Sequence, residues 1–217
     1  MQFHDRRDAG RRLAQQLIPM GISQPVVIGL PRGGVPVAFE IARVMRAQLD
    51  ILIARKIGAP ENPEYGIGAI AEGYSGLINT GELSRLGISF EQLEALVSSE
   101  RAELERRRAR FREQFPEIDV TDRPTILVDD GLATGVTATA AARALRQRAA
   151  QQIILAIPVG APSTIRAISR EVDQVLSLAA PEQFQAVGSW YIDFTPTTDG
   201  EVLELLAEAR AGWPNGR

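Results

Sequence analysis

The segment 125–139, Thr-Ile-Leu-Val-Asp-Asp-Gly-Leu-Ala-Thr-Gly-Val-Thr-Ala-Thr, most constrains the fold of this chain. Its first four residues are β-branched or apolar and predict a short buried strand. Two acids, Asp129 and Asp130, come next, and a Gly/Thr loop leads into an Ala-rich helix that starts at Val136. In open α/β sheets such a loop lies at the carboxyl edge of the sheet, where ligands bind. The segment therefore predicts an α/β protein with a ligand site at this loop.

The chemistry of the loop indicates a site for phosphate and sugar. Backbone N–H groups at a helix start, threonine hydroxyls and the positive end of the helix dipole together hold a phosphate. The carboxylates of Asp129 and Asp130 can accept hydrogen bonds from ribose hydroxyls or hold Mg²⁺ through water. The alternative is an apolar strand that ends in a polar turn and a capped helix, but it leaves the acid pair unexplained.

Two further segments carry groups that suit an anion. Residues 25–30 predict a strand that runs into Arg32, Gly33 and Gly34, and a helix is expected over 37–47. Glycines there let a ligand approach the backbone closely, although tight glycine turns after strands are common. A second buried strand, expected over 50–54, ends at Arg55 and Lys56, and two cations at a strand end suit an anionic ligand. Without the neighbouring loops, a solvated basic pair would be the simpler interpretation.

Local patterns predict the rest of the chain. The expected elements are helices over 5–17, 89–115, 162–171 and 201–211, strands over 152–157 and 173–178, a hairpin of 67–71 with 76–78, and a Gly/Pro-rich surface loop over 58–66. Ser89 and Gln92 form a capping box for the long helix. Its Glu/Arg pairs, such as Glu103 with Arg107, indicate a solvated face, and packing against a second copy of the chain is the alternative. Residues 66–71 fit G-x-G-x-x-A, but a Pro-rich loop precedes them, so a dinucleotide site is rejected.

Composition limits the classes of function. A chain of 217 residues suits one domain spanning 1–217. A net charge of -3 with acids among the arginines gives no reason to expect nucleic-acid or membrane partners. The chain has no cysteine and a single histidine, His4, so thiolate chemistry is excluded and a Ser-His-Asp triad is not expected. It also lacks a signal-peptide pattern and an apolar run near the roughly 20 residues of a membrane span, so we expect a soluble cytoplasmic protein.

Residues 128–137 resemble the phosphoribosylpyrophosphate-binding motif of type I phosphoribosyltransferases, which is a hydrophobic strand, two acids and a T/A-T-G-x-T loop. The loop at 31–34 is similar to the pyrophosphate loop of the same family. The resemblance spans nearly the whole chain. It is closest to uncharacterised bacterial phosphoribosyltransferase-like proteins that share L-P-R-G-G-V-P, R-K-x-G and A-V-G-x-W-Y, here at 30–36, 55–58 and 186–191.

The resemblance implies a type I phosphoribosyltransferase fold. Its core would span about 20–180, and a small hood would come from the N-terminal and C-terminal segments. The implied reaction transfers ribose 5-phosphate from phosphoribosylpyrophosphate to a nitrogenous base with release of pyrophosphate, and it uses Mg²⁺ held through water by Asp129 and Asp130. The implied phosphoribosylpyrophosphate-binding residues are Arg32, Gly33, Gly34, Arg55, Lys56, Asp129, Asp130, Gly131, Ala133, Thr134, Gly135, Val136 and Thr137.

The family also implies a lid and a base-binding hood. A flexible loop after the Arg-Lys pair would close over the site and exclude water. We expect residues 58–66 to be this lid, because their prolines and glycines leave little room for helix or strand. Glu61 and Glu64 would then approach the base, and Glu64 would join Asp129 and Asp130 as a catalytic residue. In the hood, Phe184 and Trp190 would stack on the base, with an aromatic core cluster as the alternative.

The acceptor stays open at this stage. Position 133 is Ala, where hypoxanthine-guanine enzymes carry an acid that assists at the base. Adenine-type enzymes have a similar L-A-T-G loop, but their base-recognition residues cannot be placed in this chain. Two other functions use the same site: a regulatory protein that senses phosphoribosylpyrophosphate or a nucleotide without turnover, and a phosphorylase or hydrolase of nucleotides.

Overall fold

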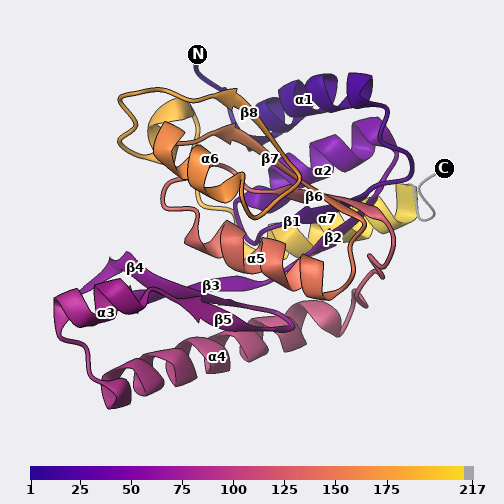
Figure 1. The fold of residues 1–217 in the computed structure, drawn as a ribbon. Coiled ribbons are helices and arrows are strands. Elements are labelled where there is room, and N and C mark those ends of the chain that lie inside the picture. The colour runs from indigo at the N-terminus through magenta and orange to yellow at the C-terminus, as the bar shows by residue number, and fades with distance from the viewer. Residues whose placement is uncertain (213–217) are drawn as a thin grey trace.

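The structure, a computed structural model, describes residues 1–212 and contains two sheets (Figure 1). The larger sheet is parallel and has the strand order β2-β1-β6-β7-β8. Its strands are β1 (Val26–Gly29), β2 (Gln48–Ile51), β6 (Pro124–Val128), β7 (Gln152–Val159) and β8 (Gln174–Ala179). Helices cover both faces of this sheet, so the predicted α/β class with a mainly parallel sheet flanked by helices is confirmed.

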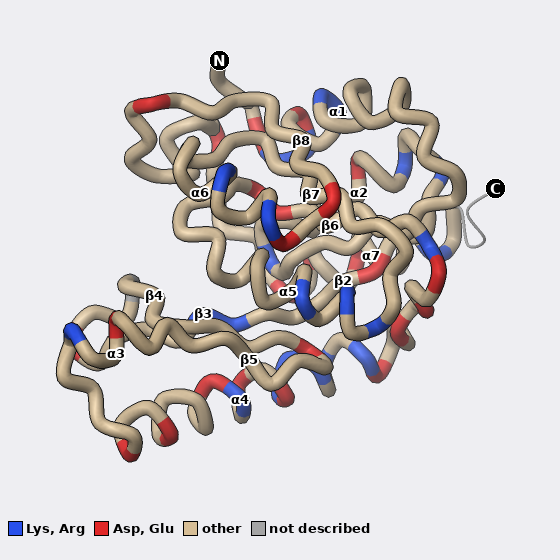
Figure 2. Tube along the Cα trace, in the orientation of Figure 1, with Lys and Arg blue, Asp and Glu red and all other residues tan. Residues whose placement is uncertain are grey.

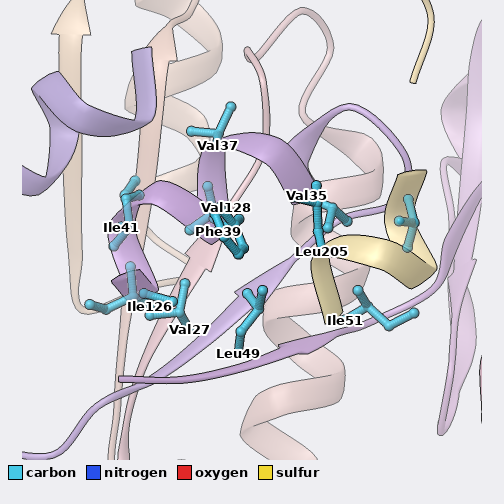
Figure 3. Packing of buried hydrophobic residues seen from close by; sticks show 14 of the residues in the cluster. Val27, Val35, Val37, Phe39, Ile41, Leu49, Ile51, Ile126, Val128 and Leu205 are labelled. Atoms are coloured by element: carbon cyan, nitrogen blue, oxygen red, sulfur yellow. The ribbon is translucent and has the colours of Figure 1, made fainter. Parts of the chain in front are cut away.

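The side chains of the parallel strands alternate between two apolar cores. Val27, Ile126 and Val128 face the core that is shared with α1 (Arg6–Leu17), α2 (Gly34–Met45) and α7 (Asp199–Gly212) (Figure 3). Val26, Ile28 and Leu127 face the opposite core, which contains α5 (Val136–Gln147) and α6 (Pro162–Ile168). Because both faces are covered, the strands are continuous apolar runs, as parallel strands usually are.

The smaller sheet is antiparallel and consists of β3 (Ala54–Ala59), β4 (Asn62–Ala71) and β5 (Tyr74–Ile78). It lies between α5 and the long helix α4 (Phe90–Arg112), and the short helix α3 (Thr80–Leu86) follows β5 (Figure 1). Figure 2 shows cationic and acidic residues interleaved along α4. The predicted capping box of Ser89 and Gln92 is present, and Arg107 pairs with Glu103 at 2.8 Å.

The expectation of an irregular loop over 58–66 is wrong, because these residues belong to the β3–β4 hairpin. The prolines and glycines are accommodated by an irregular register on either side of Gly58. A Cβ at Gly58 would overlap the carbonyl oxygen of Pro63, so glycine allows the two backbones to approach at this point. The composition argument against a strand therefore fails, and closure of residues 58–66 over the site stays a prediction. Residues 66–71 lie inside β4, where no dinucleotide loop can form.

The predicted strand over 50–54 also needs correction. It ends at Ile51, and the chain then leaves the parallel sheet, so Arg55 and Lys56 lie within β3 of the smaller sheet. Leu52 and Ile53 between the two strands are buried. The apolar run therefore continues across the break and hides it from sequence patterns.

Residues 1–5 lie against the segment 180–197, which includes the short 3-10 helix η2 (Val187–Trp190), and the two segments together are called the hood. The two segments pair directly, because Phe3 bridges to Tyr191 and the amides of Ile192 and Asp193 donate to Phe3 and His4. A second 3-10 helix, η1 (Ile18–Met20), follows α1. Within residues 1–212, every helix is too short or too polar to cross a membrane.

Candidate functional site

Two loops meet where the direction of strand order reverses. From β1 the chain moves outward to β2, and from β6 it moves the other way to β7 and β8. The loops that follow β1 and β6 therefore begin side by side at the carboxyl edge and then lead in opposite directions. At their start the amide of Leu30 donates to the carbonyl of Val128 at 2.9 Å. Such a switch point is the usual ligand site of open parallel sheets. Both sequence-predicted glycine loops lie there.

The two glycines of the first loop pack on the two acids of the second. A Cβ at Gly33 would overlap Oδ2 of Asp130. A Cβ at Gly34 would lie 2.6 Å from the carbonyl oxygen of Val128 and 2.9 Å from Cα of Asp129. Sequence reasoning assigned these glycines to close approach of a diphosphate. The structure shows a second reason for glycine at these positions: any side chain there would overlap the acid pair or its backbone.

The acids themselves are partly enclosed. Oδ1 of Asp129 accepts a hydrogen bond from the amide of Asp130 at 2.9 Å, and Oδ2 of Asp130 accepts one from Nε of Arg6 at 2.8 Å. Burial raises the pKa of Asp129, and the neighbouring charge of Asp130 raises it further. Burial also raises the pKa of Asp130, while Arg6 opposes that change. A cation near the pair would stabilise its ionised form.

Arg6 is a site residue that sequence reasoning missed. Its side chain is 10% exposed, Nη1 donates to the carbonyl of Thr195 at 2.8 Å, and the guanidinium lies 3.9 Å from the ring centroid of Phe194. Helix α1 carries four arginines that look alike in the sequence, namely Arg6, Arg7, Arg11 and Arg12. Only the neighbouring elements in space distinguish Arg6, because the bond to Asp130 joins residues 124 positions apart.

The hood contacts the acid loop through Val187 and Tyr191. The hydroxyl of Tyr191 donates to the backbone carbonyl of Asp130 at 2.6 Å, and burial raises the pKa of Tyr191. A Cβ at Gly131 would overlap Val187. The hood therefore rests directly on the residues that follow β6.

Phe184 and Trp190, the predicted base-stacking residues, pack on an aromatic cluster. They lie against buried Phe3 and Tyr191, whose ring centroids are 5.4 Å apart. Trp190 also borders a hollow of about 460 Å³ with Met1, Gln2, Gln183, Gln185 and Ser189. The contacts found for these two side chains fit the alternative of a core cluster, and base stacking stays a prediction.

The loop before α5, residues 131–135, is called the anion loop after the ligand that its sequence predicts. Gly135 has φ of +71° and precedes the helix, while Ala133 and Thr134 are exposed. The loop is fixed from behind, because Leu132 donates to Val159 at 2.8 Å and the hydroxyl of Thr164 donates to the carbonyl of Ala133 at 2.7 Å. The first amides of a helix lack intrahelical acceptors, so those at the start of α5, from Val136 and Thr137 onward, can bind a phosphate.

The three predicted cations do not all lie together. Arg55 pairs with Glu100 of α4 at 2.7 Å, and Arg32 lies 3.7 Å from Asp199 of α7. The stem of Lys56 approaches Gly66 at the same point as Cγ1 of Val136, the first residue of α5. Of the two strand cations, Lys56 therefore lies toward the anion loop and Arg55 toward α4.

The acid pair fits a magnesium ion that is held partly by its substrate. Among residues 1–212 no group of three or more His, Cys, Asp or Glu side chains could form a complete protein site. Mg²⁺ characteristically keeps several waters and uses one or two carboxylates together with substrate phosphates. Asp129 and Asp130 match that ligand set. The side chain of Glu64, a predicted catalytic residue, lies outside the described part of the structure, while Glu61 is exposed.

Comparisons with known proteins agree with this geometry. The family described as "Phosphoribosyl transferase domain" matches residues 2–192. The chain is 42% identical over 207 residues to a "Putative phosphoribosyl transferase" of Mycobacterium tuberculosis, covering 95% of this chain and 47% of that protein. It thus spans about half the length of the curated relatives it matches.

Solved structures show the same fold. A crystal structure of a protein from Thermus thermophilus has a TM-score of 0.82 and 39% identity, covering 96% of this chain and 99% of that one. A protein of Aquifex aeolicus has a TM-score of 0.52 at 11% identity, covering 93% of this chain and 86% of that one. At that identity the second likeness concerns the fold alone.

Proposed function

This chain belongs to the phosphoribosyl transferase domain family, and from that premise we propose that it transfers ribose 5-phosphate from phosphoribosylpyrophosphate to a nitrogenous base and releases pyrophosphate. Family membership and the type I phosphoribosyltransferase fold confirm the resemblance in the sequence. One observation carries the proposal for this site: the acid pair and the loop before α5 lie together at the switch point, and the acid pair touches Gly33 and Gly34 of the loop after β1.

Each part of phosphoribosylpyrophosphate, the ribosyl donor, has a matching group in the site. The 5-phosphate would bind the amides and hydroxyls that begin α5, including Thr134 and Thr137. The ribose hydroxyls would donate to Asp129 and Asp130. The diphosphate would lie toward Lys56 and the loop at 32–34. When bound, Mg²⁺ would neutralise part of the diphosphate charge, and the acid pair would hold it through water.

These contacts would orient the donor for displacement at C1 of the ribose. The acceptor nitrogen forms a bond to C1 and loses its proton to solvent, the bond from C1 to the pyrophosphate oxygen breaks, and the electron pair of that bond leaves with pyrophosphate. The protein orients the substrate and supplies hydrogen-bond donors at fixed positions, which stabilise the negative charge on the departing pyrophosphate. Ala133 does not supply the acid that assists at the base in hypoxanthine-guanine enzymes, so the acceptor base stays open.

Binding and turnover test the proposal separately. Titration calorimetry with phosphoribosylpyrophosphate and Mg²⁺ should show binding, and a panel of purine and pyrimidine bases should yield pyrophosphate with at least one member. Binding without pyrophosphate release from any base would instead support a sensing role. Absence of binding would contradict the proposal.

The acid pair gives the sharpest variant. Replacing Asp129→Asn and Asp130→Asn together should weaken donor binding by more than about tenfold, or about 1.4 kcal/mol. The matched control replaces two exposed acids remote from the loops, Asp122→Asn and Glu208→Gln, and should bind normally. Unchanged affinity in the folded Asp129/Asp130 variant would remove the assignment.

A further inference from the structure

We propose that Arg6 is a positioning residue for the donor site: it holds one oxygen of Asp130 against the Gly33 loop and leaves the other oxygen for the ligand. The inference rests on the proposed function, because it assigns a role to Asp130 in binding the donor. It joins α1 at the N-terminus to the loop after β6, two segments that no sequence motif connects.

Three contacts hold the guanidinium of Arg6 in place. Nε donates to Oδ2 of Asp130 and Nη1 donates to the carbonyl of Thr195, both at 2.8 Å, and the ring centroid of Phe194 lies 3.9 Å away. The planar guanidinium has donors in a rigid arrangement and stacks on aromatic rings, whereas a lysine ammonium is a single point charge. Arginine is therefore suited to satisfying both acceptors from one buried position.

The packing around Asp130 distinguishes its two oxygens. Oδ2 is enclosed on one side by Arg6 and on another by Gly33, where a Cβ would overlap it and would lie 3.1 Å from Nε of Arg6. Tyr191 holds the backbone of the same residue through the 2.6 Å bond to its carbonyl. Because Oδ2 is engaged, Oδ1 is the oxygen that can accept a ribose hydroxyl or a metal-bound water.

The other arginines of α1 provide an internal comparison. Arg7 and Arg11 lie 3.5 and 3.8 Å from Glu40, and Arg12 pairs with Asp8 at 2.8 Å. Glu40 and Asp8 belong to α2 and α1, away from the acid pair. Within α1, Arg6 is therefore the arginine with a partner in the donor site.

The test is a double-mutant cycle between Arg6 and Asp130, read by calorimetric titration with phosphoribosylpyrophosphate and Mg²⁺. Arg6→Met should raise Kd by about tenfold or more, the loss typical of a hydrogen bond between charged groups. Arg6→Lys should recover part of the affinity, and the control Arg11→Met should leave Kd unchanged. Since Arg6 acts through Asp130, adding Arg6→Met to Asp130→Asn should change Kd by less than about twofold.

The outcomes separate this inference from the proposed function. If the unsubstituted protein does not bind the donor, both fail. If it binds and folded Arg6→Met binds equally well, the role of Arg6 is overturned and the proposed function stands. The same conclusion follows if the losses of affinity from Arg6→Met and Asp130→Asn are additive in the double variant. A crystal structure of ligand-free Arg6→Met gives a readout that does not depend on binding. We expect the Asp130 carboxylate to leave Gly33, and an unchanged carboxylate would overturn the inference.

Discussion

Gly33 and Gly34 are neighbours in the sequence but are packed against different kinds of atom. Beside Gly33 stands the carboxylate of Asp130, the end of a side chain that can rotate. Beside Gly34 stand the carbonyl of Val128 and Cα of Asp129, which belong to the backbone at the end of β6. The same substitution at the two positions should therefore affect different properties of the protein.

We expect Gly33→Ala to disturb the site and Gly34→Ala to disturb the fold. In Gly33→Ala the carboxylate of Asp130 must move away from Arg6, so donor affinity should fall by about tenfold, as when a charged hydrogen bond is lost, while the backbone of the loop can stay in place. In Gly34→Ala the strand backbone itself must shift, and overpacking of this kind typically costs about 1–3 kcal/mol. Urea unfolding and calorimetric titration measure the two effects. Equal loss of stability in both variants would contradict this account.

At the scale of elements, strand β3 decides what its two cations can do. Side chains on a strand point alternately to opposite faces, so the adjacent residues Arg55 and Lys56 point in different directions. Arg55 faces α4 and pairs with Glu100, while Lys56 lies beside the start of α5. The sequence placed both at the end of a parallel strand, where they would have served one anion.

This alternation predicts unequal roles in binding pyrophosphate. Lys56→Met should raise the Kd for magnesium pyrophosphate by about tenfold, because one charged contact is lost. The adjacent substitution Arg55→Met removes the same charge from the opposite face and should change Kd by less than about twofold, within the small effect of a remote charge. The measurement is titration calorimetry at fixed ionic strength. A larger loss of pyrophosphate affinity in Arg55→Met than in Lys56→Met would show that Arg55, and not Lys56, faces the anion.

At the scale of the whole molecule, one buried charge network joins the two sheets. Arg112 of α4 donates to Asp50 of β2 at 2.7 Å and to Glu72, between β4 and β5, at 2.9 Å. Asp50 and Glu72 are 1% and 3% exposed. Burial raises the pKa of Asp50, and Arg112 opposes that change. For Glu72, the bonds and charge of Arg112 outweigh burial and lower the pKa. The network fixes the smaller sheet, and with it Lys56, against the parallel sheet.

Removing Arg112 should therefore lower the free energy of unfolding far more than removing a neighbouring arginine. Arg112→Met leaves two buried carboxylates without their shared cation, and breaking a buried pair typically costs about 3–5 kcal/mol. Arg108, one turn earlier, contacts the same Glu72 at 3.2 Å but is 49% exposed. Arg108→Met should cost no more than about 1 kcal/mol. Chemical denaturation of both variants provides the comparison, and similar midpoints would argue against the network. Packing of α4 against a second copy of the chain stays a prediction.

The sequence by itself determined the local units of the site. The strand, acid pair, loop and helix over 125–139 lie within one short stretch, so apolar patterning, glycine and helix composition were enough to predict them. The same holds for the strand and glycine loop that end at Gly34. The order of these units along the chain, together with the resemblance of their motifs, was enough to indicate the family and its fold.

Only the tertiary structure decided how those units are joined. It brought Arg6 to Asp130, turned Arg55 and Lys56 to opposite faces, and placed residues 58–66 in a hairpin of a second sheet. Each of these depends on a contact between segments that are distant in the chain or on the point where a strand changes sheet. Such contacts leave no periodicity or composition in the sequence, because the same arginine, apolar run or glycine fits several local structures, and packing against the rest of the molecule selects one.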